Sequence, residues 1–301
     1  MPRQHPTDNR TLRSARFAPY LMSLPGMLWL FLFFIVPLVT LLKISLSSKP
    51  NPLLPQTVFD WKWSNFGTAF SEYGGPLVRA FVYAGIATLF CVAISYPIAY
   101  FIAFKSGAWK NFLLGLVMVP FFTSFLLRTI AWKTILADQG PVMDVMRWAS
   151  LDGFFERIGI LTDGRLLNTS TAVIGGLAYN FLPFALLPIY VSLEKIDLNL
   201  MNAAADLYSP FARSFRKVIL PLSLPGVFAG TLLTFIPATG DFINAELLGN
   251  PRTAVIGTAV QNEFLDRNNY PQAAAISFVL MLIIVAAVLV YAKFLGTEDL
   301  A

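Results

Sequence analysis

The chain has 301 residues, of which 56% are hydrophobic and only 13% charged, and its formal net charge is +5. Soluble domains carry about 25% charged residues, so the composition excludes an ordinary soluble protein and indicates an integral membrane protein. A single cysteine, Cys91, excludes an intramolecular disulfide, and a single histidine, His5, in a polar tail excludes a histidine-based catalytic or metal site.

The apolar residues gather into runs of about 20 residues, the length that crosses about 30 Å of hydrocarbon. The first run, residues 21–42, follows a basic tail, residues 1–20. It is too long and too continuous for the core of a signal peptide, so we predict a retained membrane helix. A polar loop that contains several prolines then extends to residue 76.

Five further runs predict membrane helices at residues 77–104, 112–127 (extendable to 136), 171–193, 222–248 and 271–295. The polar segment 137–170 is long enough to hold a short helix on the outer surface. The expected fold class is therefore an all-α integral membrane protein with six transmembrane helices. No nucleic acid partner is expected, because the basic residues have a simpler use as topology signals.

Basic residues are dense on the short segments that would face the cytoplasm. They occupy the N-terminal tail, the loop with Lys105 and Lys110, and the segment between the fourth and fifth helices. Positive charge on short loops marks the cytoplasmic side. We therefore predict a multi-pass membrane protein with both termini, including the tail 296–301, in the cytoplasm.

The segment "MNAAADLYSPFARSFRKVILPLSLPG", residues 201–226, interrupts two long apolar runs. From Phe211 onward its apolar residues recur at helical spacing, which predicts an amphipathic helix. Ser209 and Pro210 separate this helix from an alanine-rich one at residues 198–207. One interpretation is an interfacial helix whose basic residues contact anionic lipid, namely Arg213, Arg216 and Lys217.

The same segment resembles the cytoplasmic coupling loop of the permease subunits of binding-protein-dependent ABC importers. Ala203 and Ala204 match the two alanines of that family's pattern, and Leu220-Pro221 fall at the expected spacing. The flanking stretches "YNFLPFALLPIYVSLEKID" and "LPLSLPGVFAGTLLTFIPATGDFINAELLG" resemble the spermidine/putrescine permease branch. Three positions depart from the pattern, with Asn202 in place of the acid, Tyr208 in place of a glycine that permits a bend, and Val218 in place of isoleucine.

The resemblance implies a type-1 ABC importer permease bundle over residues 77–295, with a coupling loop at about 195–221 that docks on an ATPase. It implies polyamine import, with spermidine or putrescine as cargo. Expected partners are two ATP-binding subunits, a second similar permease and an extracytoplasmic solute-binding protein. The residues assigned to coupling are Asn202, Ala203, Ala204, Asp206, Tyr208, Val218, Leu220 and Pro221.

No phosphate-binding Gly-x-x-x-x-Gly-Lys-Ser/Thr loop occurs in the chain. ATP and Mg²⁺ are therefore expected on the partner ATPase, and no cofactor, metal or enzymatic activity is expected in this chain. An intramembrane enzyme would need a nucleophile and base, which the single cysteine and the histidine of the tail do not supply. An ion-coupled secondary transporter, or an importer of another small solute, stays open as an alternative.

Ionisable side chains at membrane depth are candidates for the cargo path. Asp241 and Glu246 lie near the outer end of the fifth helix, and carboxylates together with the aromatic faces of Phe242, Tyr179 and Tyr190 could replace the hydration of a polyamine. The alternative is that the two acids lie at the outer interface or pair with a nearby basic residue, Arg252.

Asn180 interrupts the fourth helix and is also a candidate for the path. Its alternative role is a hydrogen bond to a neighbouring helix, a common use of amides in membranes. Pro183 and Pro188 predict a kink in this helix, and Pro237 and Gly240 predict a break in the fifth helix, where transport bundles often bend.

Overall fold

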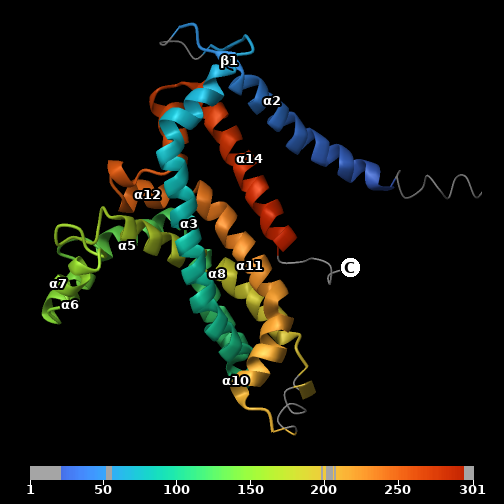
Figure 1. Cartoon of the computed structure of the whole chain (residues 1–301), viewed down its shortest axis with the longest axis vertical. Coiled ribbons are helices and arrows are strands. Elements are labelled where there is room, and N and C mark those ends of the chain that lie inside the picture. The colour runs from blue at the N-terminus through green and yellow to red at the C-terminus, as the bar shows by residue number, and fades with distance from the viewer. Residues whose placement is uncertain (1–21, 52–55, 198, 201–205, 207, 295–301) are drawn as a thin grey trace, which may run out of the picture.

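The computed structural model describes residues 22–51, 56–197, 199–200, 206 and 208–294, and these fold into an elongated bundle of helices (Figure 1). Five described helices are long and apolar enough to cross a membrane: Met22–Ser45, Ser64–Phe104, Ser170–Glu194, Phe211–Gly240 and Tyr270–Lys293. A sixth crossing results if the bent pair Gly107–Phe122 and Phe125–Ile135 counts as one. The predicted all-α membrane bundle is confirmed.

Three helices form the core: α3 (Ser64–Phe104), α8 (Ser170–Glu194) and α11 (Leu220–Gly240). Two glycines of α11, four residues apart, allow its backbone to approach α8. A Cβ atom on Gly226 would lie 2.5 Å from the carbonyl oxygen of Pro188, and one on Gly230 would lie 2.9 Å from that of Ala185. Small residues at this spacing are typical of close helix pairs in membranes.

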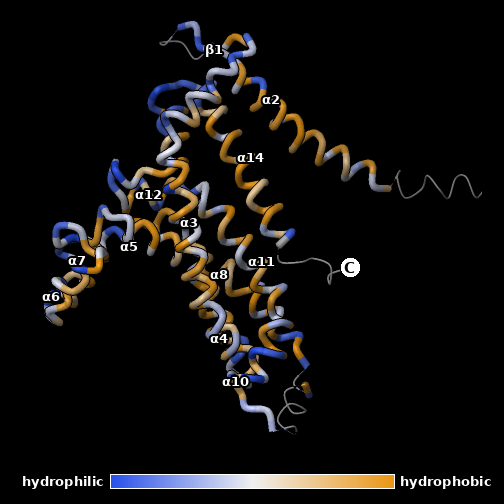
Figure 2. The backbone as a smooth tube through the Cα atoms, viewed as in Figure 1, coloured by the Kyte–Doolittle hydropathy of each residue, from blue (hydrophilic) through white to orange (hydrophobic). Residues whose placement is uncertain are grey.

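The first and last spans lie beside this core. Helix α14 (Tyr270–Phe294) packs against α3 and also against α2 (Val36–Ser45), which continues the π-helical segment η1 (Phe31–Ile35). Helix α2 leans away from the bundle (Figure 1), and its apolar surface is largely exposed (Figure 2). In a membrane this surface faces lipid or another membrane helix.

The remaining elements are short. A two-stranded antiparallel sheet, β1 (Ser47–Ser48) and β2 (Val58–Phe59), follows α2. The predicted short helix in segment 137–170 is present as two helices. The other elements are η2 (Gly107–Trp109), α4 (Lys110–Met118), η3 (Val119–Phe122), α5 (Phe125–Ile135), α6 (Pro141–Trp148), α7 (Asp152–Arg157), α10 (Phe211–Ser214), η4 (Phe215–Ile219), α12 (Ile243–Leu248), η5 (Pro251–Thr253), α13 (Ile256–Gln261) and η6 (Asn262–Asp266).

The prediction of one continuous third helix over residues 112–127 is wrong. The chain passes from α4 through the 3-10 segment η3 and turns by 91° before α5. Thr123 at the turn has an extended backbone, with φ −85° and ψ 151°. Pro120 lacks an N–H donor for a continuing helix, and the chain turns by about a right angle between the short elements on both sides.

Two further boundaries differ from prediction. Helix α3 begins at Ser64 rather than at residue 77, because its first turns pack on α14, with the Phe66 and Phe278 rings 6.4 Å apart. The fifth helix ends at Gly240 instead of residue 248, and α12 follows as a separate helix. We refer below to the Phe211 end and the Ser64 end of the bundle, after the residues at which α10 and α3 begin.

Candidate functional site

A network of buried polar side chains surrounds the break between α11 and α12. Asn180 of α8 donates from Nδ2 to Thr129 Oγ1 of α5 and to Asn244 Oδ1 of α12, both at 3.1 Å. Asn244 in turn donates to Asp241 Oδ1, from its backbone nitrogen at 2.8 Å and from Nδ2 at 3.1 Å. One network therefore joins three helices to the first residue after α11.

The break itself is set by backbone geometry. Asp241 leaves the helix with φ −69° and ψ 123°, so its carboxylate can cap the next helix by accepting from Asn244. Two glycines allow the neighbouring elements to approach. A Cβ on Gly176 would lie 2.7 Å from Asn244 Oδ1, and one on Gly257 would lie 2.7 Å from the carbonyl oxygen of Gly240.

The network lies near the middle of the bundle rather than at its surface. Asn180 is ten residues from the start of α8 at Ser170, a rise of about 15 Å along the helix. Asn180 and Asn244 are almost fully buried, with 1% and 0% exposure, whereas Asp241 is half-buried. Polar groups at this depth are costly in a membrane and therefore mark a functional region.

The predicted residues of the path are only partly brought together here. Asp241 and Asn180 share the network. Asn180 bonds to two neighbouring helices, which is the structural role given above as the alternative to contact with cargo. Phe242 and Tyr179 are partly exposed, at 39% and 37%, and the Tyr179 ring meets Trp132 at 5.2 Å. Contact of Phe242 and Tyr179 with cargo stays a prediction.

Two other predicted residues lie apart from the network. Glu246 is exposed on α12 and forms no ion pair with Arg252 in the part of the chain that the structure describes. Tyr190 is buried in a different cluster, where its ring lies 5.5 Å below the ammonium of Lys110. Contrary to our expectation, Tyr190 therefore does not lie beside Asp241.

Arg128 is a residue that the sequence analysis passed over. It precedes Thr129 on α5, and its guanidinium Nε and Nη1 atoms are buried with no hydrogen-bond partner among the described residues. The side chain lies over the ring of Phe125 at 5.7 Å. A buried, unpaired cation beside the polar network is a second unusual charge at this depth. The only sequence signal was an arginine inside an apolar run.

The predicted coupling segment is described in part. Asn202, Ala203 and Ala204 lie outside the described residues, whereas Asp206 is helical and exposed. Tyr208 has φ +53°, a left-handed conformation that favours glycine, and is 96% exposed. The bend that the family glycine permits is therefore present at Tyr208 without the glycine.

The amphipathic helix predicted from Phe211 is not separate from the fifth membrane helix, which was predicted to begin only at residue 222. Helices α10, η4 and α11 run on as one helix from Phe211 to Gly240, past Val218, Leu220 and Pro221. Pro221 lies inside this continuous helix, two residues after the π-helical segment η4, and such local changes of helix type let membrane helices tolerate a proline. Of its predicted apolar face, Ile219 is fully buried, whereas Phe211 and Leu222 are exposed.

Aromatic contacts attach this helix to α3 at the Phe211 end. The rings of Phe211 and Phe215 lie 6.3 Å and 6.1 Å from that of Tyr100, and Tyr96 contacts Phe215 at 5.8 Å. The Tyr96 hydroxyl also lies 2.7 Å from Ser223 Oγ. The start of the long helix is therefore held against α3 at several points.

A salt bridge closes the same end. Lys110 Nζ at the start of α4 lies 2.5 Å from Glu194 Oε1 at the end of α8. Both side chains are partly exposed, so the pair contributes little to stability but fixes the α4 turn beside the end of α8. Among the described residues no three His, Cys, Asp or Glu side chains group as a metal site.

Comparisons with known proteins agree with this architecture. The family model "Binding-protein-dependent transport system inner membrane component" matches residues 95–294. The spermidine/putrescine transport system permease protein PotB of Haemophilus influenzae is 34% identical over 268 residues, which cover 87% of this chain and 89% of that protein. PotB of Escherichia coli is 33% identical over 265 residues, with 87% and 92% covered.

Solved structures show the same fold at lower identity. A chain of a bacterial ABC transporter that imports the acidic polysaccharide alginate matches with a TM-score of 0.70 at 17% identity, covering 96% of this chain and 98% of that one. The MetNI methionine ABC transporter matches with a TM-score of 0.54 over 73% of this chain and 93% of that one. The chain therefore belongs to the family of inner membrane components of binding-protein-dependent transport systems.

Proposed function

We propose that the chain is the permease subunit of an ATP-driven importer that moves polyamines such as spermidine and putrescine across the cytoplasmic membrane. The observation that carries this proposal is the identity with PotB proteins over most of both chains. The polar network at the break after α11, with the half-buried carboxylate of Asp241, supports it, because a polyamine is a flexible polycation that needs negative or aromatic groups along its path.

The carboxylate of Asp241 is the group best placed to meet an ammonium. Its Oδ1 accepts both hydrogen bonds from Asn244, and no described residue donates to its Oδ2. The half-buried side chain therefore keeps one oxygen for a cation, with Phe242 and Tyr179 partly exposed to contribute aromatic faces. Glu246, exposed on α12, supplies a second carboxylate on the way to the break.

The partners follow from the same proposal. Two ATPase subunits that carry ATP and Mg²⁺ dock on the coupling segment, a second similar permease completes the path, and a solute-binding protein delivers the cargo. The Phe211 end then faces the cytoplasm together with both termini, and the Ser64 end faces outward. The dense positive charge of the tail and of segment 201–226 supports this orientation.

Uptake of labelled spermidine tests the cargo. Cells that lack the chain should lose ATP-dependent uptake and regain it on complementation, and excess putrescine should compete. Uptake that is unchanged without the chain would refute polyamine cargo. Uptake that stops on collapse of the ion gradient, but persists on ATP depletion, would identify an ion-coupled secondary transporter instead.

Asp241→Asn tests the path. Loss of one charge contact of about 1.4 kcal/mol should raise the KM for spermidine about tenfold, at unchanged protein level in the membrane. Asp144→Asn is the control, because Asp144 is an exposed acid on α6, away from the network. Equal uptake curves for the two variants would remove Asp241 from the path.

Ala204→Asp tests the coupling assignment. A buried charge at the docking surface should abolish transport while membrane insertion continues. Asn199→Asp adds the same charge to an exposed position of the same segment and should transport normally. Normal transport by the Ala204 variant would refute docking at this position.

A further inference from the structure

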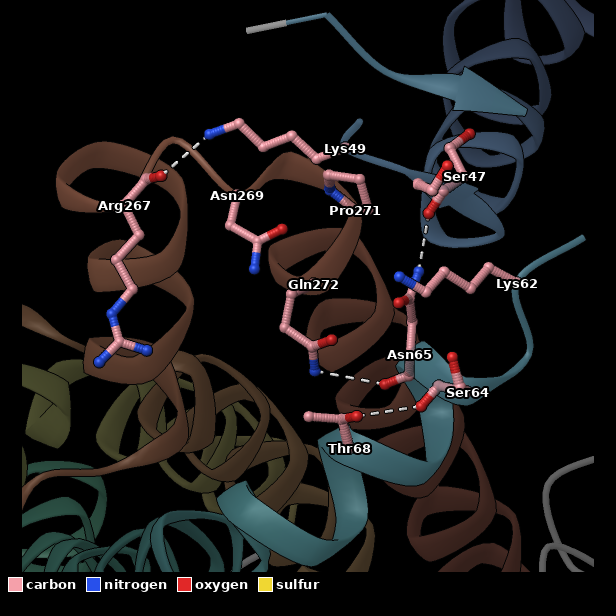
Figure 3. A pocket seen from close by; sticks show the side chains of 11 residues that line it. Ser47, Lys49, Lys62, Ser64, Asn65, Thr68, Arg267, Asn269, Pro271 and Gln272 are labelled. Atoms are coloured by element: carbon pink, nitrogen blue, oxygen red, sulfur yellow. Dashed lines mark hydrogen bonds between the residues drawn. The ribbon is translucent and has the colours of Figure 1, made fainter. Parts of the chain in front are cut away.

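A polar cavity of about 450 Å³ lies at the Ser64 end of the bundle, away from the proposed cargo path (Figure 3). Lys49 and Lys62 reach it from the segment between α2 and α3, and Arg267 from the approach to α14. The described residues that line it include these three basic side chains and no acidic one. The cavity is therefore a site of positive potential.

Hydrogen bonds between distant segments hold the cavity open. Asn65 at the start of α3 donates from Nδ2 to the carbonyl oxygens of Ser45 and Ser47, both at 2.9 Å. Gln272 of α14 donates from Nε2 to the carbonyl oxygen of Asn65 at 3.2 Å. Because Asn65 and Gln272 are both buried, these bonds fix the outer ends of α2, α3 and α14 relative to one another.

The charge of Arg267 is already compensated. Its Nη1 atom lies 2.6 Å from Oε1 of the buried Glu263, which also accepts from Tyr73 at 2.6 Å and from Asn269 at 2.9 Å. The nearby Glu263 carboxylate raises the pKa of Arg267 above its usual range. The positive potential that can bind a ligand therefore comes from the two lysines rather than from Arg267.

Neither lysine forms an ion pair with a described residue. Lys49 Nζ donates to the carbonyl oxygen of Arg267 at 3.2 Å, and the Lys62 ammonium has no partner among the described residues. The N-termini of α3 and α14 meet at the same cavity, and neither has an acidic residue in its first turn. Both helix dipoles therefore add positive potential.

The cavity also lies where the hydrocarbon ends. The span Met22–Ser45 ends beside it and the span Tyr270–Lys293 begins beside it, and each has the length of one membrane crossing. Trp61 and Trp63, next to Lys62, are 61% and 64% exposed. Exposed tryptophans beside basic residues are typical of the membrane–water interface.

We propose that this cavity binds the phosphate group of a membrane phospholipid, held by Lys49 and Lys62. The acyl chains then lie along the apolar surface of the span Met22–Ser45 toward its Ser45 end, where Ile35, Val36 and Val39 are exposed. A bound lipid would fill the angle between α2 and the bundle and so fix the first span. This inference does not depend on the cargo of the transporter.

The test uses the assembled transporter, purified in detergent with wild-type chain or with Lys49→Gln, Lys62→Gln or both. Native mass spectrometry would measure retention of added phosphatidylglycerol. Each single variant should lower the affinity about fivefold and the double variant about 25-fold, from the usual contribution of a basic residue to anionic lipid binding. Lys43→Gln is the matched control, an exposed lysine near the end of α2 that does not line the cavity.

Several results would overturn the proposal. One is equal lipid retention by the double variant and the wild-type chain, and another is equal loss in the control. If inorganic phosphate alone binds in a lysine-dependent manner while phosphatidylglycerol does not, the site takes a free anion. If the lysine variants lose the solute-binding protein but keep the lipid, the cavity receives an acidic partner side chain. The single variants keep the test open if the double variant fails to assemble.

Discussion

Neighbouring glycines in α8 give a sharp test of how α12 is held against the bundle. A Cβ atom on Gly176 would lie 2.4 Å from Leu248 Cδ1 and 2.7 Å from Asn244 Oδ1, whereas one on Gly175 would meet nothing within 4 Å. Leu248 and Asn244 are fully buried, so neither has open space into which to move. The two positions share a helix and differ only in this contact.

Gly175→Ala should stabilise the chain by about 0.5–1 kcal/mol, because alanine favours a helix more than glycine does. Gly176→Ala gains the same amount but overpacks the contact, at about 1–3 kcal/mol. It also strains the hydrogen bond from Asn180 to Asn244, an interaction that averages about 0.6 kcal/mol in membranes. Because the propensity gain is common to both, Gly176→Ala should be less stable than Gly175→Ala by about 1 to 3.6 kcal/mol.

The midpoint of SDS-induced unfolding of each variant in mixed micelles would measure this difference, and uptake at matched protein levels would report on function. We expect reduced uptake only for Gly176→Ala, because the shift of α12 away from α8 moves Asn244 away from Asn180. Equal midpoints for the two variants would refute the claim that Gly176 is required for the position of α12.

Three further predictions concern separate parts of the chain. Tyr208→Gly should keep or raise ATP-coupled uptake in proteoliposomes. It should add at most about 1 kcal/mol to the stability of the fold, because glycine removes the left-handed strain. Reduced uptake would reveal a contact of the Tyr208 ring in the complex. Arg128→Met should stabilise the chain against SDS by about 1–3 kcal/mol, because the thioether side chain has no N–H donor to leave unpaired; a loss of stability would show that the guanidinium has a partner. Tyr100→Ala should lower coupled uptake at normal membrane insertion and destabilise the chain by about 2 kcal/mol. Phe122→Ala, at a side chain that is 85% exposed, should do neither. Equal effects of the two variants would contradict a role for the Tyr100 ring in holding Phe211 and Phe215.

The sequence located helices well where an apolar run ends sharply. The predicted spans 171–193 and 271–295 differ by one residue at each end from α8 and α14. The start of α3 was missed because residues 64–76 are polar and rich in glycine, and their helix depends on contacts with α14 such as the bond from Gln272 to Asn65. Tertiary packing overrides local propensity at such positions.

The bend of the third span was also beyond the sequence. Pro120 permits a bend but does not dictate one, since membrane helices often tolerate proline. The 91° turn brings Thr129 to Asn180, 51 residues away, and this pairing involves two elements that local pattern cannot relate. For the same reason Arg128 was read as one residue of a continuing helix rather than as a buried cation.

The site was predicted in composition more than in geometry. Pro237 and Gly240 correctly indicated a break, and the break places Asp241 in a capping position that a continuous helix would not give it. Asn244, which links Asp241 to Asn180, was not predicted. Its role depends on α12 being a separate helix, and the apolar run through residue 248 concealed that boundary.

The continuous helix from Phe211 to Gly240 connects the predicted coupling segment to the polar network around Asp241. Thirty residues form a rod of about 45 Å, with the aromatic contacts to Tyr100 at one end and Asp241 directly after the other. Gly226 and Gly230 bring its middle into backbone contact with α8, so sliding along α8 would require these contacts to separate. We therefore expect a force applied at Phe211 to tilt α11 together with α8. The relative motion must then appear where the helices are broken, at α5 and α12, which are the two elements that hold Thr129 and Asn244 against Asn180.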